Sequence, residues 1–253
     1  MIYSHYSEYM SKAMSDGRPG PDPGEYEFLS KYLTANEQPF LELACGYGRL
    51  LLPIMEKGFT VVGTDSSPEM LARCRHFAEK KGLKPVLHQQ FMQRLELDQT
   101  FGFIFLADGG LTLVIEDDDI RELFKRVWNH LKPGGTFLFD FFRYDPKAPE
   151  TSNLQTNGWR QVSESTLWLT RKISSYDPAT GRTERVQVHD LYVDGKLVGS
   201  QAYEDPQRDH DPQQLMERLK TLGFTEIRLG GDNTDSPPEP GDSLVSIRCK
   251  RPR

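Results

Sequence analysis

The chain has 253 residues, of which 37% are hydrophobic and 27% charged, and its formal net charge at pH 7 is −6. This length allows one sizeable α/β domain with an insertion, or two small domains. The acidic balance and the lack of a basic block argue against nucleic acid as a partner.

The sequence also argues against a membrane protein. No apolar run approaches the roughly 18 residues that a membrane-spanning helix needs, and residues 1–8 show no secretory signal pattern. Cys45, Cys74 and Cys249 lie within or beside apolar segments and lack CxxC spacing, so we expect buried, reduced thiols. We therefore expect a cytoplasmic protein without a membrane partner, present as a monomer or a homodimer.

Residues 1–36 are expected to form an N-terminal helical cap. Tyr3, Tyr6, Tyr9, Met10 and Met14 recur at helical spacing. The stripe fits a helix that packs on the domain, and it equally fits a cap that brings a tyrosine, with Tyr6 the candidate, into a ligand site. The proline-rich segment 18–24 predicts a loop, and a second helix should cover about 25–34.

The stretch from Phe40 to Leu50 predicts a strand, a tight glycine loop and the start of a helix. A second strand should follow at 61–65, ending in Asp65. Gly46 and Gly48 have no Cβ, so the loop between them can adopt positive φ and let a ligand approach the backbone. Asp65 would then stand where a carboxylate can accept the hydroxyl groups of a ribose.

Strands and helices continue to alternate up to residue 142. A helix should begin after Ser67 with a serine cap and a proline at its first position. Strands are expected at 84–91, 101–107 and 136–142, with a helix after the three acids 117–119. We expect those acids to stabilise the helix dipole rather than to bind a metal. The alternation predicts an α/β protein with a parallel, doubly wound sheet.

The pattern changes after the fifth strand. Residues 166–204 have the two-residue period of strands and contain two turn signals, 177–181 and Asp194-Gly195. We therefore expect a three-stranded antiparallel insertion at the carboxyl edge of the sheet, where ligands bind in open α/β folds. Its aromatic residues either pack the insertion onto the main domain or form the wall of an acceptor pocket; they are Trp159, Trp168, Tyr176, Tyr192 and Tyr203.

Three motifs together indicate a family. They are Glu42-Leu-Ala-Cys-Gly-Tyr-Gly-Arg49, Gly63-Thr-Asp-Ser-Ser-Pro-Glu-Met-Leu71 and Leu131-Lys-Pro-Gly-Gly135. A dinucleotide fingerprint would have a third glycine where Leu51 stands. The sequence instead resembles the class I S-adenosylmethionine-dependent methyltransferases, over about residues 37–142 and 211–251.

The resemblance implies an architecture. It implies a seven-stranded, doubly wound Rossmann-like methyltransferase sheet with its last strand antiparallel, and a small antiparallel β insertion after the fifth strand. The S-adenosylmethionine-binding α/β domain would cover 37–142 and 211–253, and the inserted antiparallel lid would cover 143–210.

The resemblance also implies which residues contact the cofactor. Glu42 and the loop residues should hold the methionine part, Asp65 the ribose, and Met70 the adenine face, while Ala107 should lie beside the transferred methyl group. Many members carry an acid after the third strand that binds the adenine amino group, and this chain has Gln90-Phe91-Met92 there. The full set of expected cofactor contacts is Glu42, Ala44, Cys45, Gly46, Gly48, Asp65, Ser66, Met70, Gln90, Phe91, Met92 and Ala107.

The chemistry implied is methyl transfer to a small molecule, with an amine as the candidate acceptor, which leaves S-adenosylhomocysteine. A sulfonium is already a good leaving group, so the protein has mainly to align acceptor, methyl and sulfur. No metal is expected. Candidate catalytic residues are Tyr6, Asp108 and His189. Asp108 fits an acceptor contact or a loop carboxylate that binds local N–H groups, and His189 fits a general base or a plain lid histidine.

Three other functions fit parts of the pattern. A nicotinamide-dependent oxidoreductase is disfavoured by the missing third glycine. A non-catalytic S-adenosylmethionine-binding module fits the replaced adenine-side acid. Nucleic-acid methylation is disfavoured by the charge and by the lack of an Asn/Asp-Pro-Pro-Tyr-type tetrapeptide after the fourth strand. N-methylation of a small molecule is favoured over O-methylation.

Overall fold

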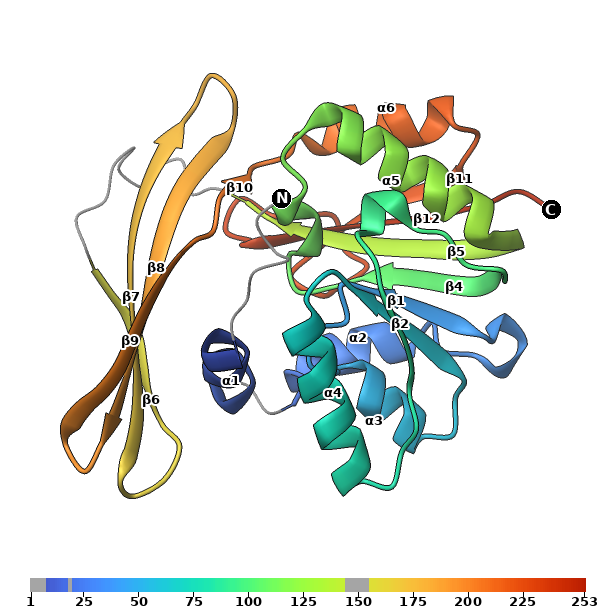
Figure 1. The fold of residues 1–253 in the computed structure, drawn as a ribbon. Coiled ribbons are helices and arrows are strands. Elements are labelled where there is room, and N and C mark those ends of the chain that lie inside the picture. Colours follow the sequence, from blue (N-terminus) through green and yellow to red (C-terminus); the bar gives the residue numbers. More distant parts are fainter. Residues whose placement is uncertain (1–7, 18–19, 144–154) are drawn as a thin grey trace.

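The computed structural model describes residues 8–17, 20–143 and 155–253. A central sheet has helices on both faces, and a second sheet stands beside it as a separate layer (Figure 1). The helices are α1 (Glu8–Gly17), α2 (Pro23–Ser30), α3 (Leu51–Glu56), α4 (Pro68–Lys80), α5 (Asp117–His130) and α6 (Pro212–Thr221), with short 3₁₀ helices η2 (Ala35–Glu37), η3 (Met92–Arg94) and η4 (Gly110–Leu113).

The central sheet has seven strands in the order β11-β12-β5-β4-β1-β2-β3. They are β1 (Phe40–Leu43), β2 (Val61–Asp65), β3 (Val86–Gln89), β4 (Phe101–Leu106), β5 (Leu131–Phe142), β11 (Thr225–Gly231) and β12 (Leu244–Lys250). The first five strands are parallel, and β12 runs antiparallel to both β5 and β11. This confirms the expected methyltransferase topology. It also places the carboxyl ends of five strands at one edge.

Alternating aromatic residues divide the core between the two faces of the sheet. Phe137, Phe139 and Phe141 pack in a cluster with residues of α5 and α6. Phe40 and Phe103 point to the opposite face and pack with residues of α2, α3 and α4. Both faces are therefore buried, which explains why these strands read as continuous apolar runs rather than as an alternation of polar and apolar residues. Among the described residues, no helix combines the length and apolarity needed to cross a bilayer.

The second sheet is larger than the sequence predicted. It contains β6 (Gln155–Gln161), β7 (Thr166–Asp177), β8 (Arg182–Val193), β9 (Lys196–Glu204) and the short β10 (Gln207–Arg208). The predicted hairpin at Asp194-Gly195 is confirmed, because both residues have positive φ and connect β8 to β9. The expectation of three strands is wrong. Strand β6 is polar apart from Trp159, which is 68% exposed, so it lacks the apolar alternation that marks a strand.

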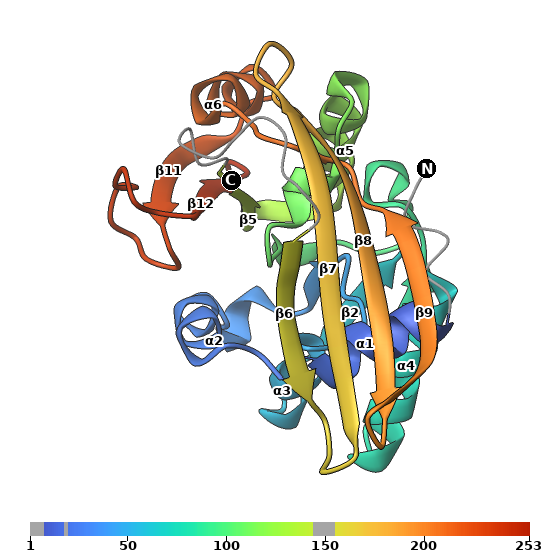
Figure 2. The ribbon, with the colours of Figure 1, turned by 90° about the vertical axis from the view of Figure 1, so that its left-hand side faces the viewer.

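Helix α1 lies between the two sheets, beside α4 (Figures 1 and 2). Arg73 of α4 donates hydrogen bonds to Ser15 Oγ, at 3.0 and 2.7 Å, and forms an ion pair with Asp16 at 3.1 Å. These contacts fix the C-terminal end of α1 over the edge of the central sheet. The expected helix is present over residues 8–17, while Tyr3 and Tyr6 lie outside the described residues.

The two loop glycines are required for different reasons. Gly48 has φ +85°, and a Cβ added there would lie 2.6 Å from Cys74 Sγ and 2.9 Å from Leu52 Cγ. Gly46 has φ +55°, and an added Cβ would meet no atom within 4 Å. At position 46 glycine is required only because the backbone has a positive φ. At position 48 it is required for the same reason and also because a side chain would clash with Cys74 and Leu52.

We expect Gly48→Ala to destabilise the fold more than Gly46→Ala. Each substitution costs about 1 kcal/mol for the left-handed backbone, and Gly48→Ala adds about 1–3 kcal/mol for overpacking against Cys74. Urea unfolding of the two variants measures the difference. Equal free energies of unfolding would show that the loop relaxes away from Cys74 without cost.

Candidate active site

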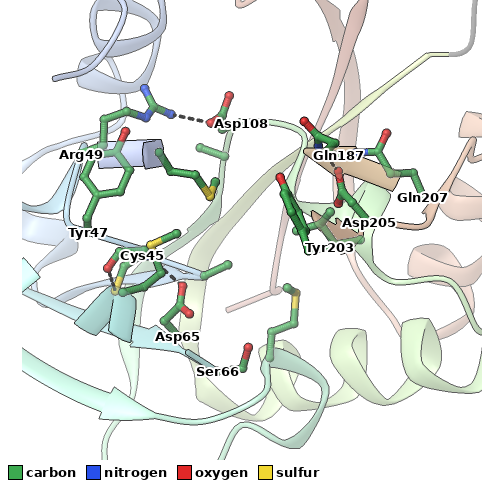
Figure 3. A pocket seen from close by; sticks show the side chains of 18 of the residues that line it. Cys45, Tyr47, Arg49, Asp65, Ser66, Asp108, Gln187, Tyr203, Asp205 and Gln207 are labelled. Carbon is green, nitrogen blue, oxygen red and sulfur yellow. Dashed lines mark hydrogen bonds and ion pairs between the residues drawn. The ribbon is translucent and has the colours of Figure 1, made fainter. Parts of the chain in front are cut away.

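A cavity of about 890 Å³ lies between the carboxyl edge of the central sheet and the inner face of the second sheet. Polar side chains from both layers face the same hollow (Figure 3). The central sheet and its loops contribute most of the predicted site residues. Those that line the cavity are Glu42, Ala44, Cys45, Gly46, Asp65, Ser66, Met70, Gln90, Phe91, Met92, Ala107 and Asp108, joined by His189 from the second sheet.

Asp65 ends β2 and is fixed by backbone hydrogen bonds. Gly46 N donates to Asp65 Oδ2 and Ser67 N donates to Asp65 Oδ1, each at 2.8 Å. Ser67 also caps α4, because its hydroxyl accepts a hydrogen bond from Met70 N. Burial raises the pKa of Asp65 to about 6, and these backbone N–H groups oppose the rise. A carboxylate has about four acceptor sites, and three backbone N–H groups bond Asp65, so it can still accept from a ligand donor.

Glu42 is a buried acid with an unsatisfied oxygen. Its side chain is 5% exposed, it lines the cavity, and its Oε2 has no hydrogen-bond partner in the protein. Burial raises the pKa of Glu42 well above its usual range, and the nearby charge of Arg49 opposes this rise. Buried polar atoms are nearly always paired. The free acceptor therefore fits a ligand that brings a hydrogen-bond donor, or a cation, to the glycine loop.

The glycine loop itself offers little side-chain chemistry. Gly46 borders the cavity, whereas Gly48 is not among the lining residues and packs against Cys74. Burial raises the pKa of the Cys45 thiol, so this side chain is a protonated small hydrophobe and a poor nucleophile. The loop therefore supports a ligand through backbone shape and through the neighbouring acids Glu42 and Asp65.

The residues after β3 form the apolar end of the cavity. Phe91 and Met92 line it from one side and Met70 from another. The carboxamide of Gln90 is already engaged: its Nε2 donates to Glu96 O and its Oε1 accepts from Glu96 N, both at 2.8 Å. The Gln90 side chain is thus committed to holding the loop.

An ion-pair network links α2, the glycine loop and the end of β4. Arg49 donates to Glu25, with Nη2 and Oε1 2.7 Å apart and a second bond between Nη1 and Oε2. Arg49 Nη2 also lies 3.4 Å from Asp108 Oδ2 (Figure 3). Glu25 and Arg49 are both buried, and Asp108 is 42% exposed. Arg49 therefore positions a solvent-accessible carboxylate at the wall of the cavity.

Asp140, on β5, supports that wall from behind. Asp108 and Gly109 both have positive φ, at 62° and 71°, and Gly109 N donates to Asp140 Oδ1 at 2.6 Å. Burial, helped by the negative charges of Asp108 and Glu25, raises the pKa of Asp140 to about 8, and the hydrogen bond from Gly109 N opposes the rise. Asp140 was not among the site residues predicted from the sequence. In the sequence it stands out as a single acid inside the apolar run 136–142.

The inner face of the second sheet supplies a polar wall opposite Asp108. Thr170 Oγ1 lies 2.8 Å from His189 Nδ1, and the His189 ring stacks on Tyr203 at 5.6 Å. Asp205 accepts hydrogen bonds from Arg185 and Gln187. Burial lowers the pKa of His189, which keeps the imidazole neutral near pH 7. Of the lid aromatics, Trp159, Trp168 and Tyr203 line the cavity, and Tyr176 and Tyr192 do not.

Two further expectations concern Tyr6 and metal binding. Tyr6 lies outside the described residues, so its predicted role stays a prediction. Within residues 8–17, 20–143 and 155–253, no group of three or more His, Cys, Asp or Glu side chains is arranged to hold a metal ion.

Comparison with known proteins agrees with this geometry. Residues 40–135 match the family model described as "Methyltransferase domain". The whole chain aligns with "Putative methyltransferase YqeM" of Bacillus subtilis (strain 168), at 28% identity over 99% of this chain and 98% of that protein. Residues 40–135 are thus a methyltransferase domain, and together with the fold these findings support a class I S-adenosylmethionine-dependent methyltransferase with S-adenosylmethionine as its cofactor.

Solved structures share the whole architecture. An S-adenosylmethionine-dependent methyltransferase from Clostridium acetobutylicum ATCC 824 superposes with a TM-score of 0.79 at 21% identity, covering 95% of this chain and 97% of that one. The sugar N-methyltransferase KedS8 from Streptoalloteichus sp. ATCC 53650 gives a TM-score of 0.75 at 16% identity, covering 100% and 97%. Both likenesses extend over the lid as well as the central sheet.

We expect Asp65→Ala to weaken S-adenosylhomocysteine binding tenfold or more, because a ribose contact to a charged group contributes about 1.5–3 kcal/mol. Isothermal titration calorimetry measures the dissociation constant. Glu79→Ala, which removes an exposed acid in the last turn of α4, serves as the control. Unchanged affinity of Asp65→Ala would remove Asp65 from the binding site.

We expect Asp140→Asn to change how stability depends on pH. The folded-state pKa of Asp140, about 8, exceeds its value in the unfolded chain, so the contribution of Asp140 is fully present at low pH and is lost as pH rises toward 8. The stability of the wild type relative to Asp140→Asn should therefore fall between pH 5 and 8, by at most about 1.4 kcal/mol per pH unit. Urea unfolding at several pH values tests this, and a constant difference would contradict it.

Proposed function

We propose that this methyltransferase transfers the methyl group of S-adenosylmethionine to the nitrogen of a small-molecule amine. The observation that carries the proposal is the charge of the cavity. Six carboxyl groups and three guanidinium groups line it; the acids are Glu42, Asp65, Asp108, Glu116, Asp119 and Asp205, and the arginines are Arg49, Arg160 and Arg185. An acidic cavity attracts cations and repels anionic acceptors.

The residues at the carboxyl edge fit the cofactor. Glu42, with its unsatisfied oxygen, would accept from the α-ammonium group, and Gly46 leaves open space beside the glycine loop. Asp65 would accept from the ribose hydroxyls, and Met70, Phe91 and Met92 would flank the base. Ala44, Cys45, Ser66 and Ala107 complete the wall, and Gly48 supports the loop from behind. The bound cofactor supplies a methyl group already activated as a sulfonium.

Asp108 is our proposed contact for the acceptor. Its carboxylate is exposed to the cavity, and Arg49 and the Asp140-supported turn fix its position. An acceptor that arrives as an ammonium ion would be held by this carboxylate with its nitrogen toward the cofactor. Placing the reacting atoms in line, with water excluded by the lid, lowers the barrier without a covalent intermediate.

An ammonium group must lose a proton before it can attack, and His189 is the proposed proton acceptor. It faces the cavity, is neutral near pH 7, and is oriented by Thr170 and by the ring of Tyr203. Neutral imidazole is the usual general base at this pH. The proposed role of Tyr6 is to close the acceptor pocket from the N-terminal cap.

The same charge favours nitrogen over oxygen as the target atom. A hydroxyl acceptor would have to develop negative charge beside Asp108, and nearby carboxylates raise the free energy of such an oxyanion. An amine passes from a cation to a neutral nucleophile and creates no anion. The fold shared with a protein named as a sugar N-methyltransferase supports a small, polar amine as the acceptor class.

The proposal predicts which compounds become methylated. Purified enzyme with S-adenosylmethionine should methylate members of a panel of small amines, including amino sugars, and should leave the matched hydroxyl analogues unchanged; mass spectrometry detects the added methyl group. Transfer to the hydroxyl analogues alone would contradict the proposal.

We further expect Asp108→Asn to lower kcat/KM for the amine at least tenfold, because the variant loses a contact worth about 1.5–3 kcal/mol to the ammonium group. The affinity for S-adenosylhomocysteine should change little. Asp118→Asn is the matched control, since Asp118 is exposed and pairs with Arg121 on the surface. Equal kcat/KM in the wild type and Asp108→Asn would remove Asp108 from the acceptor site.

A further inference from the structure

The chain lacks the usual means of recognising the 6-amino group of adenine. No acid follows β3 in the stretch Gln89-Gln-Phe-Met-Gln-Arg94. The nearest polar replacement, Gln90, has both ends of its carboxamide bonded to the backbone of Glu96. The amino group donates hydrogen bonds, so a cofactor base buried in this cavity needs an acceptor from elsewhere in the chain.

A pair of polar side chains lines the cavity close in sequence and space to the residues that follow β3. Gln93, in η3, donates from Nε2 to Asp119 Oδ2 at 3.4 Å, and both residues line the cavity and are partly buried. Asp119 belongs to the first turn of α5, which packs against η3. The pairing therefore joins two elements that are close in space and 26 residues apart in sequence.

The topology places the base near this pair. Asp65, at the end of β2, is the proposed ribose contact. The glycine loop follows β1, and β3 lies on the other side of β2 from β1. With the methionine part at the glycine loop and the ribose at Asp65, the base would extend past Met70 toward η3. Met70, Phe91 and Met92 would be its apolar surroundings, and Gln93 and Asp119 are polar groups in the same cavity lining.

Asp119 differs from the other two acids of the same helical turn. Asp117 is bound by Arg208 and Arg218, and Asp118 is bound by Arg121. Neither Asp117 nor Asp118 lines the cavity. Asp119 accepts from the neutral carboxamide of Gln93, which leaves lone pairs of its carboxylate available to a ligand.

We propose that Asp119, oriented by Gln93, accepts a hydrogen bond from the 6-amino group of the cofactor's adenine and thereby replaces the acid missing after β3. A carboxylate accepts but does not donate, so it distinguishes a 6-amino from a 6-oxo group. Hypoxanthine in the same position would turn a carbonyl oxygen toward the Asp119 carboxylate, and the two acceptors would repel each other. Asp119 is then a specificity residue for the adenine base.

The test measures base preference in the absence of any methyl acceptor. Calorimetry gives the dissociation constants of S-adenosylhomocysteine and S-inosylhomocysteine, its 6-oxo analogue, for the wild type, Asp119→Asn and Asp118→Asn. The wild type should prefer adenine. In Asp119→Asn the preference should fall at least tenfold, because the new amide NH₂ can donate to the 6-oxo group. Asp118→Asn makes the same charge change in the same turn and should keep the wild-type preference.

An unchanged preference in Asp119→Asn, or an equal loss in Asp118→Asn, overturns the proposal. Thermal unfolding confirms that each variant is folded, and Asp119→Ala is the second variant if the asparagine variant is not. Failure of the wild type to bind either compound overturns the proposal together with the cofactor assignment. The result is independent of the acceptor, so it leaves the N-methylation proposal to its own test.

Discussion

Carboxyl groups removed from water at the edge of the central sheet are the constraint on which the rest of the site depends. Glu42 and Asp140 are buried and Asp65 is half-buried, at or near the ends of three different strands, and removal from water raises the pKa of each. A buried charge is costly unless it is hydrogen-bonded or paired. Backbone N–H groups of the glycine loop, of the α4 cap and of the turn at Gly109 meet part of this demand. In our proposal, a cationic ligand meets the remaining demand.

The same constraint couples the two halves of the proposed reaction. Arg49 directly follows the glycine loop and contacts both Glu25 and Asp108. Asp140 holds the left-handed turn that carries Asp108. The position of the Asp108 carboxylate, our proposed contact for the methyl acceptor, is therefore set by side chains from α2, the segment after the glycine loop and β5. An in-line displacement requires such shared positioning, since a small error in alignment is costly to the rate.

Local signals were sufficient for most of the fold. The glycine pair, the Ser67 cap and the Asp194-Gly195 hairpin each have a short-range cause, and the structure shows all three. Strand β6 was missed because it pairs with β7 while remaining polar and exposed, so no apolar alternation marks it. The register between β7 and β8 decides that His189 faces the cavity while its neighbour Asp190 pairs with Arg171 and Ser200.

Site residues that belong to one sequence motif could be predicted, whereas those that come from elements far apart in the sequence could not. Residues of the glycine loop and the end of β2 lie together in one stretch of sequence, and apart from Gly48 the predicted ones line the cavity. Asp140, Asp119 and Asp205 come from three other elements, and only tertiary packing brings them near the loop. A single acid in the apolar strand β5 was the signal for Asp140. Nothing in the sequence distinguishes Asp119 from Asp117 and Asp118, the other two acids at the start of α5.

The account rests on buried acids that become charged when the cofactor binds. Calorimetric titration with S-adenosylhomocysteine at pH 6, repeated in buffers of different ionisation enthalpy, measures the protons exchanged on binding. The account predicts net proton release, because Asp65, with a pKa of about 6, and Glu42 ionise as they accept the ribose hydroxyls and the ammonium group. Binding without proton release would show that these carboxyl groups do not hold the cofactor, and would contradict the account.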